Sequence, residues 1–217
     1  MTRVKVCCIA SVEEARLAVC AGASALGLVS EMPSGPGVIS EARIAAIAAT
    51  VSAATDTFLL TSRTNAGEIA AQQRRCGVNT IQICDGVSPP VYEELRRSLP
   101  GISLVQVIHV TGEPSLTEAR RLAPEVDALL LDTGDRSLPT PELGGTGRTH
   151  DWHVSARIVE NSPVPVFLAG GLNPENVGEA ICLVRPFGVD LCTGVRSAGR
   201  LDERKLQEFM AAVAAAS

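Results

Sequence analysis

The sequence predicts a closed (β/α)8 barrel, in which eight parallel strands are each followed by a helix. Short runs rich in Val, Ile and Leu alternate with longer segments of helical periodicity along the whole chain. This unit recurs eight times in 217 residues, the number that closes a parallel sheet. The composition is 46% hydrophobic but only 3% aromatic, as expected of an aliphatic sheet covered by Ala-rich helices. An open doubly wound sheet is the alternative.

The predicted strands are short apolar segments at regular intervals. In chain order they are residues 3–7, 24–29, 57–60, 79–83, 103–109, 127–131, 164–169 and 188–192. Segments with helical periodicity fill the intervals, at residues 11–22, 40–51, 65–77, 89–99, 115–124, 151–160, 174–184 and 202–216.

Several of the predicted helices carry recognisable end signals. Ser11 followed by Glu14 forms a capping box, and Gly22 and Gly77 stand where helix C-caps are expected. No linker, low-complexity run or charge block divides the chain. We therefore expect a single barrel domain over residues 1–217.

Charge and hydropathy exclude several classes of partner. The formal net charge of −5 argues against nonspecific binding to nucleic acid or to an anionic membrane, since both require an excess of Lys and Arg. No run approaches the roughly 18 apolar residues that span a bilayer, and the N-terminus lacks the pattern of a signal peptide. We expect a cytoplasmic protein, either a monomer or a homodimer, that acts on a small molecule.

Seven cysteines raise the question of disulfides. Thiols stay reduced in the cytoplasm, and an odd count does not fit a disulfide framework. We therefore expect the cysteines to be free.

The barrel prediction places the active site at the carboxyl ends of the strands. The residues found there are Cys7, Cys8, Val29, Thr61, Cys84, His109, Asp132, Gly170, Gly171 and Thr193.

The first strand ends in two adjacent cysteines. Side chains alternate between the two faces of a strand, so Val4, Val6 and Cys8 share one face, and Lys5 and Cys7 share the other. We expect the first face to meet the outer helices and Cys7 to look into the barrel mouth. Either cysteine can also be a small buried hydrophobe, as free cysteines usually are.

Asp132 ends the otherwise apolar strand of sequence DALLLD. It is either a cap for the following loop or a functional acid set against a hydrophobic wall. Partial burial would raise its pKa, which a general acid working near neutral pH requires.

Glycine-rich turns follow the last three strands. The long loop after Asp132 contains Gly144-Gly145-Thr146-Gly147, Gly170-Gly171 precede a helix, and Thr193-Gly194 follow the eighth strand. Glycines let backbone amides approach an anion closely, and phosphate often binds after strands seven and eight of a barrel. The pattern predicts a phosphate site at these turns.

Two groupings of residues raise the possibility of a metal site. They are His150, Asp151 and His153, and the strand-ending Cys7, Cys84 and Cys192. The first begins a helix, where an acid at Asp151 is favoured by the helix dipole, and the second has no CxxC spacing. We expect no metal.

Four motifs together resemble those of the phosphoribosylanthranilate isomerase family over essentially the whole chain. They are KVCCIAS, LLLD followed by GGTGRTHDW, LAGGLNPENV, and GVDLCTGV. The resemblance implies a barrel that catalyses an Amadori rearrangement in tryptophan biosynthesis, without a metal or organic cofactor. It implies that Cys7 is the general base and Asp132 the general acid.

The resemblance also assigns the phosphosugar contacts. Amides around Gly170-Gly171 and Thr193-Gly194 would bind the phosphate, and the loop containing Gly145 and Gly147 would cover the substrate.

The chain departs from the family pattern at four places. Cys8 replaces a glycine, and Ile83-Cys84-Asp85 replaces Leu-His-Gly. Arg196 stands where an acid is usual. The segment SEMPSGPGVIS after the second strand lacks the arginine suited to the anthranilate carboxylate, a role open to Arg63, Arg148 or Arg196.

Three functions are compatible with these observations. The first is the isomerase itself, and the second is a related isomerase that acts on a different phosphosugar. The third is an inactive barrel that binds a phosphorylated ligand.

Overall fold

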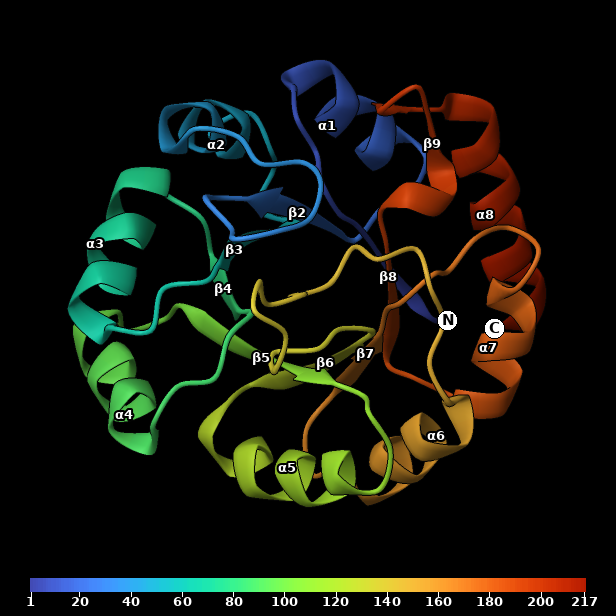
Figure 1. The fold of residues 1–217 in the computed structure, drawn as a ribbon. Helices are drawn as coiled ribbons and strands as arrows, with labels where there is room; N and C mark the ends of the chain where they lie inside the picture. Colours follow the sequence, from blue (N-terminus) through green and yellow to red (C-terminus); the bar gives the residue numbers. More distant parts are fainter.

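Eight parallel strands close into a barrel in the computed structural model, which describes residues 1–217 (Figure 1). The strands are β1 Arg3–Val6, β2 Ala25–Val29, β3 Asp56–Thr61, β4 Thr80–Ile83, β5 Ser103–His109, β6 Ala128–Asp132, β7 Val166–Leu168 and β8 Gly188–Leu191. Each pairs with the next, and β1 pairs in parallel with β8. The predicted barrel is confirmed, and the open sheet is excluded.

One helix follows each strand, and the helices form a ring around the barrel (Figure 1). They are α1 Val12–Cys20, α2 Glu41–Ala48, α3 Ala66–Cys76, α4 Pro89–Ser98, α5 Pro114–Leu122, α6 Trp152–Asn161, α7 Val177–Val184 and α8 Glu203–Ala216. Short 3-10 turns occur at η1 Ala123–Glu125 and η2 Thr193–Val195. A two-stranded hairpin of β9 Arg196–Ser197 and β10 Arg200–Leu201 lies between η2 and α8. No helix is both long and apolar enough to cross a membrane.

The sequence signals at the helix ends are largely confirmed. The Ser11 hydroxyl accepts a hydrogen bond from the Glu14 amide at 3.2 Å, which caps α1. The Glu14 carboxylate accepts from the Ala10 amide at 3.0 Å rather than from the Ser11 amide, so only half of the predicted capping box forms. Gly77 caps α3 with a φ of +67°, and Gly22 follows the cap of α1 with a φ of +100°. Both glycines adopt backbone conformations that residues with a Cβ rarely reach.

Side-chain alternation divides the apolar residues into two cores. Val4 and Val6 of β1, with Leu26 of β2, belong to the larger core between the barrel and its helices. Cys7 and Ala25 belong to the smaller core inside the barrel. Several polar side chains of the strands are also buried, among them Lys5, Gln82 and Asp190.

Candidate active site

A cavity opens at the carboxyl ends of the strands, where loops from both halves of the chain meet. It encloses about 680 Å³ of open space, its mouth included, which is within the size range of small-molecule sites. Seven of the eight residues predicted for the site line it: Cys7, Asp132, Gly145, Gly147, Gly170, Gly171 and Thr193. Gly194 does not line the cavity. A Cβ at this position would overlap the Leu172 carbonyl, so Gly194 allows two loops to pack closely.

Cys7 immediately follows β1, and its thiol lies in the barrel interior as strand alternation predicts. Its amide donates to the Leu191 carbonyl at 2.8 Å, which continues the pairing of β1 with β8 by one residue. Burial raises the pKa of the Cys7 thiol to about 11, although the Lys5 ammonium opposes the shift. The thiolate of Cys7 is therefore a minor species at neutral pH.

Lys5 and Asp190 form a buried ion pair beneath Cys7. Their Nζ–Oδ2 distance is 2.8 Å, and the two residues face each other in the register of β1 and β8. Burial lowers the pKa of Lys5, but Asp190 and neighbouring thiols raise it by more, so the ammonium stays charged. The second carboxylate oxygen of Asp190, Oδ1, is buried without a hydrogen-bond partner, and Asp190 lines the cavity. An acceptor for a ligand hydroxyl is therefore present at the cavity floor.

Asp132 ends β6 under the long loop that follows it. Its Oδ1 accepts a hydrogen bond from the Thr133 amide at 2.7 Å, and the Gly145 amide also stabilises the carboxylate. Burial, with a contribution from the negative charge of Asp190, nevertheless raises the pKa of Asp132 to about 7. The carboxyl group is thus partly protonated at neutral pH, the condition that a general acid must satisfy.

Glycine-containing loops after β6, β7 and β8 meet around the cavity. Gly170 and Gly171 have φ values of +87° and +64°, and a Cβ on Gly171 would lie 2.7 Å from the Arg148 carbonyl carbon. A Cβ on Gly147 would lie 3.7 Å from Thr193 Oγ1. The amides of Gly170 and Gly171 donate to no backbone carbonyl. Paired free amides in such a turn form an anion-binding concavity.

Two residues of the first grouping considered for a metal site, His150 and Asp151, make other hydrogen bonds. His150 hydrogen-bonds through Nδ1 to Thr133 Oγ1 at 3.1 Å and through Nε2 to Ser155 Oγ at 2.7 Å. Asp151 caps α6 by accepting from the His153 amide at 2.9 Å. No group of three or more His, Cys, Asp and Glu side chains is arranged to hold a metal ion.

Cys8 does not face the outer helices with Val4 and Val6, so that prediction is wrong. The strand ends at Val6, and the chain turns at Cys8 with a φ of +61°, so the alternation of β1 does not extend to it. Cys8 lines the cavity and packs against Gly37 of the loop after β2. The left-handed conformation explains why a glycine suits this position.

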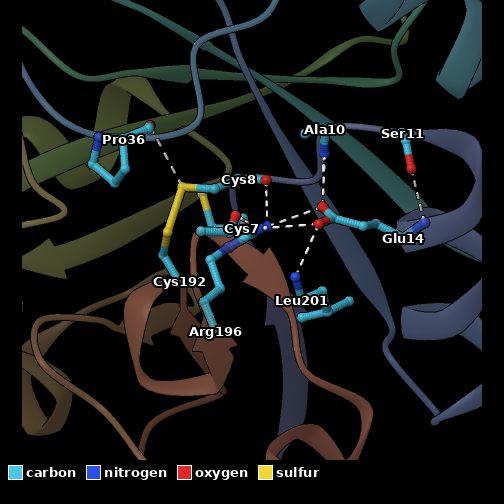
Figure 2. Close-up of polar contacts among 10 residues, drawn as sticks. Cys7, Cys8, Ala10, Ser11, Glu14, Pro36, Cys192, Arg196 and Leu201 are labelled. Carbon is cyan, nitrogen blue, oxygen red and sulfur yellow. Dashed lines mark hydrogen bonds and ion pairs between the residues drawn. A yellow bond between two sulfur atoms is a disulfide. The ribbon is translucent and has the colours of Figure 1, made fainter.

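Cys8 and Cys192 form a disulfide (Figure 2), which corrects the expectation that all cysteines are free. The two residues are 184 positions apart, but their Cα atoms are 5.9 Å apart because closure of the barrel brings β1 beside β8. The remaining five cysteines, including Cys7, are free thiols. The disulfide joins the loop that carries Cys7 to the loop that carries Thr193.

Replacing Cys192 by serine is expected to destabilise the protein by about 2–4 kcal/mol, because the bond closes a loop of nearly the whole chain. The melting temperature should fall by roughly 5–15 °C, measured by calorimetry without reductant. Cys20→Ser, which removes an exposed free thiol, is the control and should leave the melting temperature unchanged. Alkylation of all seven thiols in unreduced, denatured protein would contradict the disulfide.

No arginine lines the cavity. The three candidates for binding an aromatic carboxylate form ion pairs outside it: Arg63 with Glu68, Arg148 with Glu142 and Arg196 with Glu14. The cavity wall near the loop after β2 is instead apolar, formed by Val29, Met32, Leu60 and Leu143.

Two buried polar residues of the cavity were not identified from the sequence as functional, Gln82 and Asp190. Both are buried, and each has one oxygen without a hydrogen-bond partner, Oε1 of Gln82 and Oδ1 of Asp190. The sequence carries a usable signal for Asp190, a charged residue within the otherwise apolar predicted strand 188–192, but not for Gln82, because the predicted strand 79–83 contains two further polar residues.

Gly27 of β2 leaves the space that the Cys7 thiol occupies. A Cβ at this position would lie 2.7 Å from Cys7 Sγ and 3.1 Å from Lys5 Nζ. Gly27→Ala is therefore expected to displace the thiol and to lower kcat by roughly tenfold or more. Gly178→Ala is the matched control, since its Cβ would meet nothing within 4 Å. An unchanged kcat in folded Gly27→Ala would show that the thiol is not confined there.

Comparison with known proteins identifies the family. Residues 4–212 match the family model of N-(5'-phosphoribosyl)anthranilate (PRA) isomerase. The chain is 33% identical over 211 residues to the N-(5'-phosphoribosyl)anthranilate isomerase of Methanocella arvoryzae, covering 97% of each chain. A phosphoribosyl anthranilate isomerase structure from Thermus thermophilus superposes with a TM-score of 0.82 at 26% identity, over 100% of both chains.

A second solved structure is a phosphoribosyl anthranilate isomerase in complex with reduced 1-(o-carboxyphenylamino)-1-deoxyribulose 5-phosphate. It superposes with a TM-score of 0.80 at 26% identity, over 99% of this chain and 100% of that one. The match of the family model over nearly all residues and the whole-length relatives lead to one conclusion. This chain belongs to the N-(5'-phosphoribosyl)anthranilate isomerase family.

Proposed function

We propose that this protein converts N-(5'-phosphoribosyl)anthranilate to 1-(2-carboxyphenylamino)-1-deoxyribulose 5-phosphate, an aldose–ketose type isomerisation in tryptophan biosynthesis. The observation that carries the proposal is a single cavity lined by Cys7, Asp132 and the glycine turns. Membership of the isomerase family supports it, as does the complex of a solved relative with a reduced product.

Asp132 is the general acid of the proposed reaction. As the furanose ring opens, its carboxyl proton passes to the ring oxygen, and the nitrogen lone pair forms a C1=N Schiff base. A carboxyl with a pKa of about 7 carries this proton in a substantial fraction of molecules at neutral pH. Burial beneath the loop that contains Gly144 and Gly145 keeps the pKa of Asp132 raised and so maintains this protonation.

Cys7 is the general base. Its thiolate removes the proton from C2, and the electron pair forms a C1=C2 enolamine. The Asp132 carboxylate then takes the C2 hydroxyl proton while the Cys7 thiol returns its proton to C1, which gives the aminoketose. Over the whole cycle both side chains return to their initial states, so no oxidant or reductant is consumed. The Lys5 ammonium beneath Cys7 favours the thiolate, although burial keeps it a minor species.

The glycine turns bind the phosphate in this proposal. The amides of Gly170 and Gly171 are free of backbone acceptors, and Thr193 adds a hydroxyl from the loop after β8. The loop with Gly145 and Gly147 covers the cavity from the β6 side. Fixing the phosphate places the sugar between Cys7 and Asp132.

The decisive experiment is direct turnover. The purified protein should isomerise freshly prepared N-(5'-phosphoribosyl)anthranilate, followed by loss of anthranilate-type fluorescence, and its gene should restore growth of an isomerase-deficient, tryptophan-requiring host. Absence of both at saturating substrate would refute the proposal.

A second candidate is the same rearrangement on a phosphosugar with a different amine substituent. It is favoured by one observation, the absence of any lysine or arginine from the cavity wall. The two functions are separated by comparing N-(5'-phosphoribosyl)anthranilate with an N-phosphoribosyl arylamine that lacks the carboxylate, each offered as substrate. Comparable kcat/KM values for both substrates would favour the broader specificity, and a strong preference for the anthranilate would exclude it.

A further inference from the structure

Arg196 contacts the backbone that carries Cys7 (Figure 2). It does not line the cavity. It begins β9, directly after η2, and its side chain is only 9% exposed. Its Nη2 donates to the carbonyl of Cys8 and, at 3.5 Å, to that of Cys7. Its Nη1 donates to the Gly199 carbonyl at 3.0 Å. One guanidinium therefore holds two consecutive peptide groups of the β1–α1 loop.

Glu14 of α1 holds the guanidinium in place. Oε1 and Oε2 of Glu14 lie 3.1 Å from Nη1 and Nη2 of Arg196, a two-pronged geometry that fixes the plane of the fork. The same carboxylate accepts from the amides of Ala10 at 3.0 Å and Leu201 at 2.9 Å. The pair thus links the β1–α1 loop, α1 and the β9–β10 hairpin.

The loop needs such restraint because of its backbone. Cys8 adopts a φ of +61°, which costs a residue with a Cβ about 1–2 kcal/mol. Conformations of this kind persist only where surrounding contacts over-determine them. Here the restraints are the Cys8–Cys192 disulfide on the side-chain atoms and Arg196 on the carbonyls.

We propose that Arg196 is a positioning residue for the isomerisation, which fixes the peptide after Cys7 so that the thiol is directed at the reacting carbon. The kinetic part of this inference rests on the proposed function. Arg196 acts through geometry rather than charge, because Glu14 neutralises it. The charged groups that shift the pKa of Cys7 are Lys5, Asp190 and Asp132.

The test compares Arg196→Gln, Arg196→Lys and wild type. Misplacement of the thiol should lower kcat by roughly ten- to a hundredfold in Arg196→Gln, with KM within about twofold and the pH limbs of the rate unchanged. Arg196→Lys keeps the positive charge but loses the two-pronged guanidinium geometry, so its kcat should lie between those of wild type and Arg196→Gln. A third variant, Arg196→Ala, tests chemical rescue of the missing side chain. Guanidinium ion added at millimolar concentration should partly restore its kcat, whereas tetramethylammonium ion should not.

Two controls separate positioning from general destabilisation. Phe209→Leu removes packing from the outer core, and Arg204→Ala breaks the exposed pair with Glu208 on α8. The first should lower the melting temperature without lowering kcat, and the second should change neither. A kcat in Arg196→Gln equal to wild type, or a loss that follows the melting temperature in both Arg196→Gln and Phe209→Leu, would overturn the inference.

Amide hydrogen exchange provides a readout that does not depend on activity. Exchange at Cys8, Ile9 and Ala10 should accelerate in Arg196→Gln relative to wild type, and exchange in β5 should not. If wild type shows no turnover, the proposed function fails while this measurement still tests the restraint. If wild type turns over and neither kcat nor exchange responds to Arg196→Gln, only the positioning role fails.

Discussion

Cys7→Ser is expected to lower kcat for N-(5'-phosphoribosyl)anthranilate by about 10³–10⁴-fold, the upper range of what a general base contributes. A serine hydroxyl fills nearly the same volume, but it does not ionise in the accessible pH range, so no competent base remains. The melting temperature should change little, because the Cys7 side chain makes no disulfide. Single-turnover kinetics on freshly generated substrate provide the measurement.

Cys20→Ser is the matched control, since it makes the same chemical change at an exposed free thiol and should retain full activity. A loss of less than about tenfold in Cys7→Ser would show that another group removes the C2 proton. Asp190 would then be the first alternative, because its free Oδ1 faces the same cavity.

Asp132→Asn is expected to lower kcat by about 10²–10⁴-fold, because the amide has no acidic proton to give to the ring oxygen. Asparagine preserves the shape of the side chain, and its Oδ1 still accepts from the Thr133 amide. The loss should therefore appear in kcat rather than in KM or in the melting temperature.

The pH dependence distinguishes this role from a structural one. In the proposed mechanism the active form carries a thiolate at Cys7, with a pKa of about 11, and a protonated Asp132, with a pKa of about 7. Below pH 7 both groups are protonated, so kcat/KM rises about tenfold per pH unit with thiolate formation. Between about pH 7 and pH 11, Cys7 and Asp132 together hold one proton. The fraction of molecules with both a thiolate and a protonated Asp132 then stays constant at about 10⁻⁴, because the two pKa values differ by 11 − 7 = 4.

The wild-type profile of kcat/KM should thus rise up to about pH 7, stay level, and fall above about pH 11. Residual activity in Asp132→Asn should instead continue to rise through pH 7, because only Cys7 then titrates. A variant profile that still levels off at pH 7 would assign that limb to another group.

The sequence was sufficient to predict the fold because the signals that specify it are local. Hydrophobic periodicity and helix caps act over a few residues, and they locate all eight strands within two residues of their observed ends. The alternation of side chains along β1 also predicted that the Cys7 side chain points into the barrel, because the strand is regular up to Val6. The rim position of Asp132 and of the glycine turns follows from strand ends in the same way.

Tertiary structure decided the contacts between residues far apart in the sequence, which local sequence signals do not specify. The left-handed turn at Cys8 cancels the alternation one residue beyond the strand, and barrel closure brings Cys8 to Cys192 across 184 residues. Closure of the barrel also sets Lys5 opposite Asp190, and it brings Arg196 to the carbonyls of the β1–α1 loop. Sequence therefore determined the elements and the direction of their regular side chains. The pairing of the first strand with the last determined the environment of the thiol, because the contacts that tune and hold it come from the opposite end of the chain.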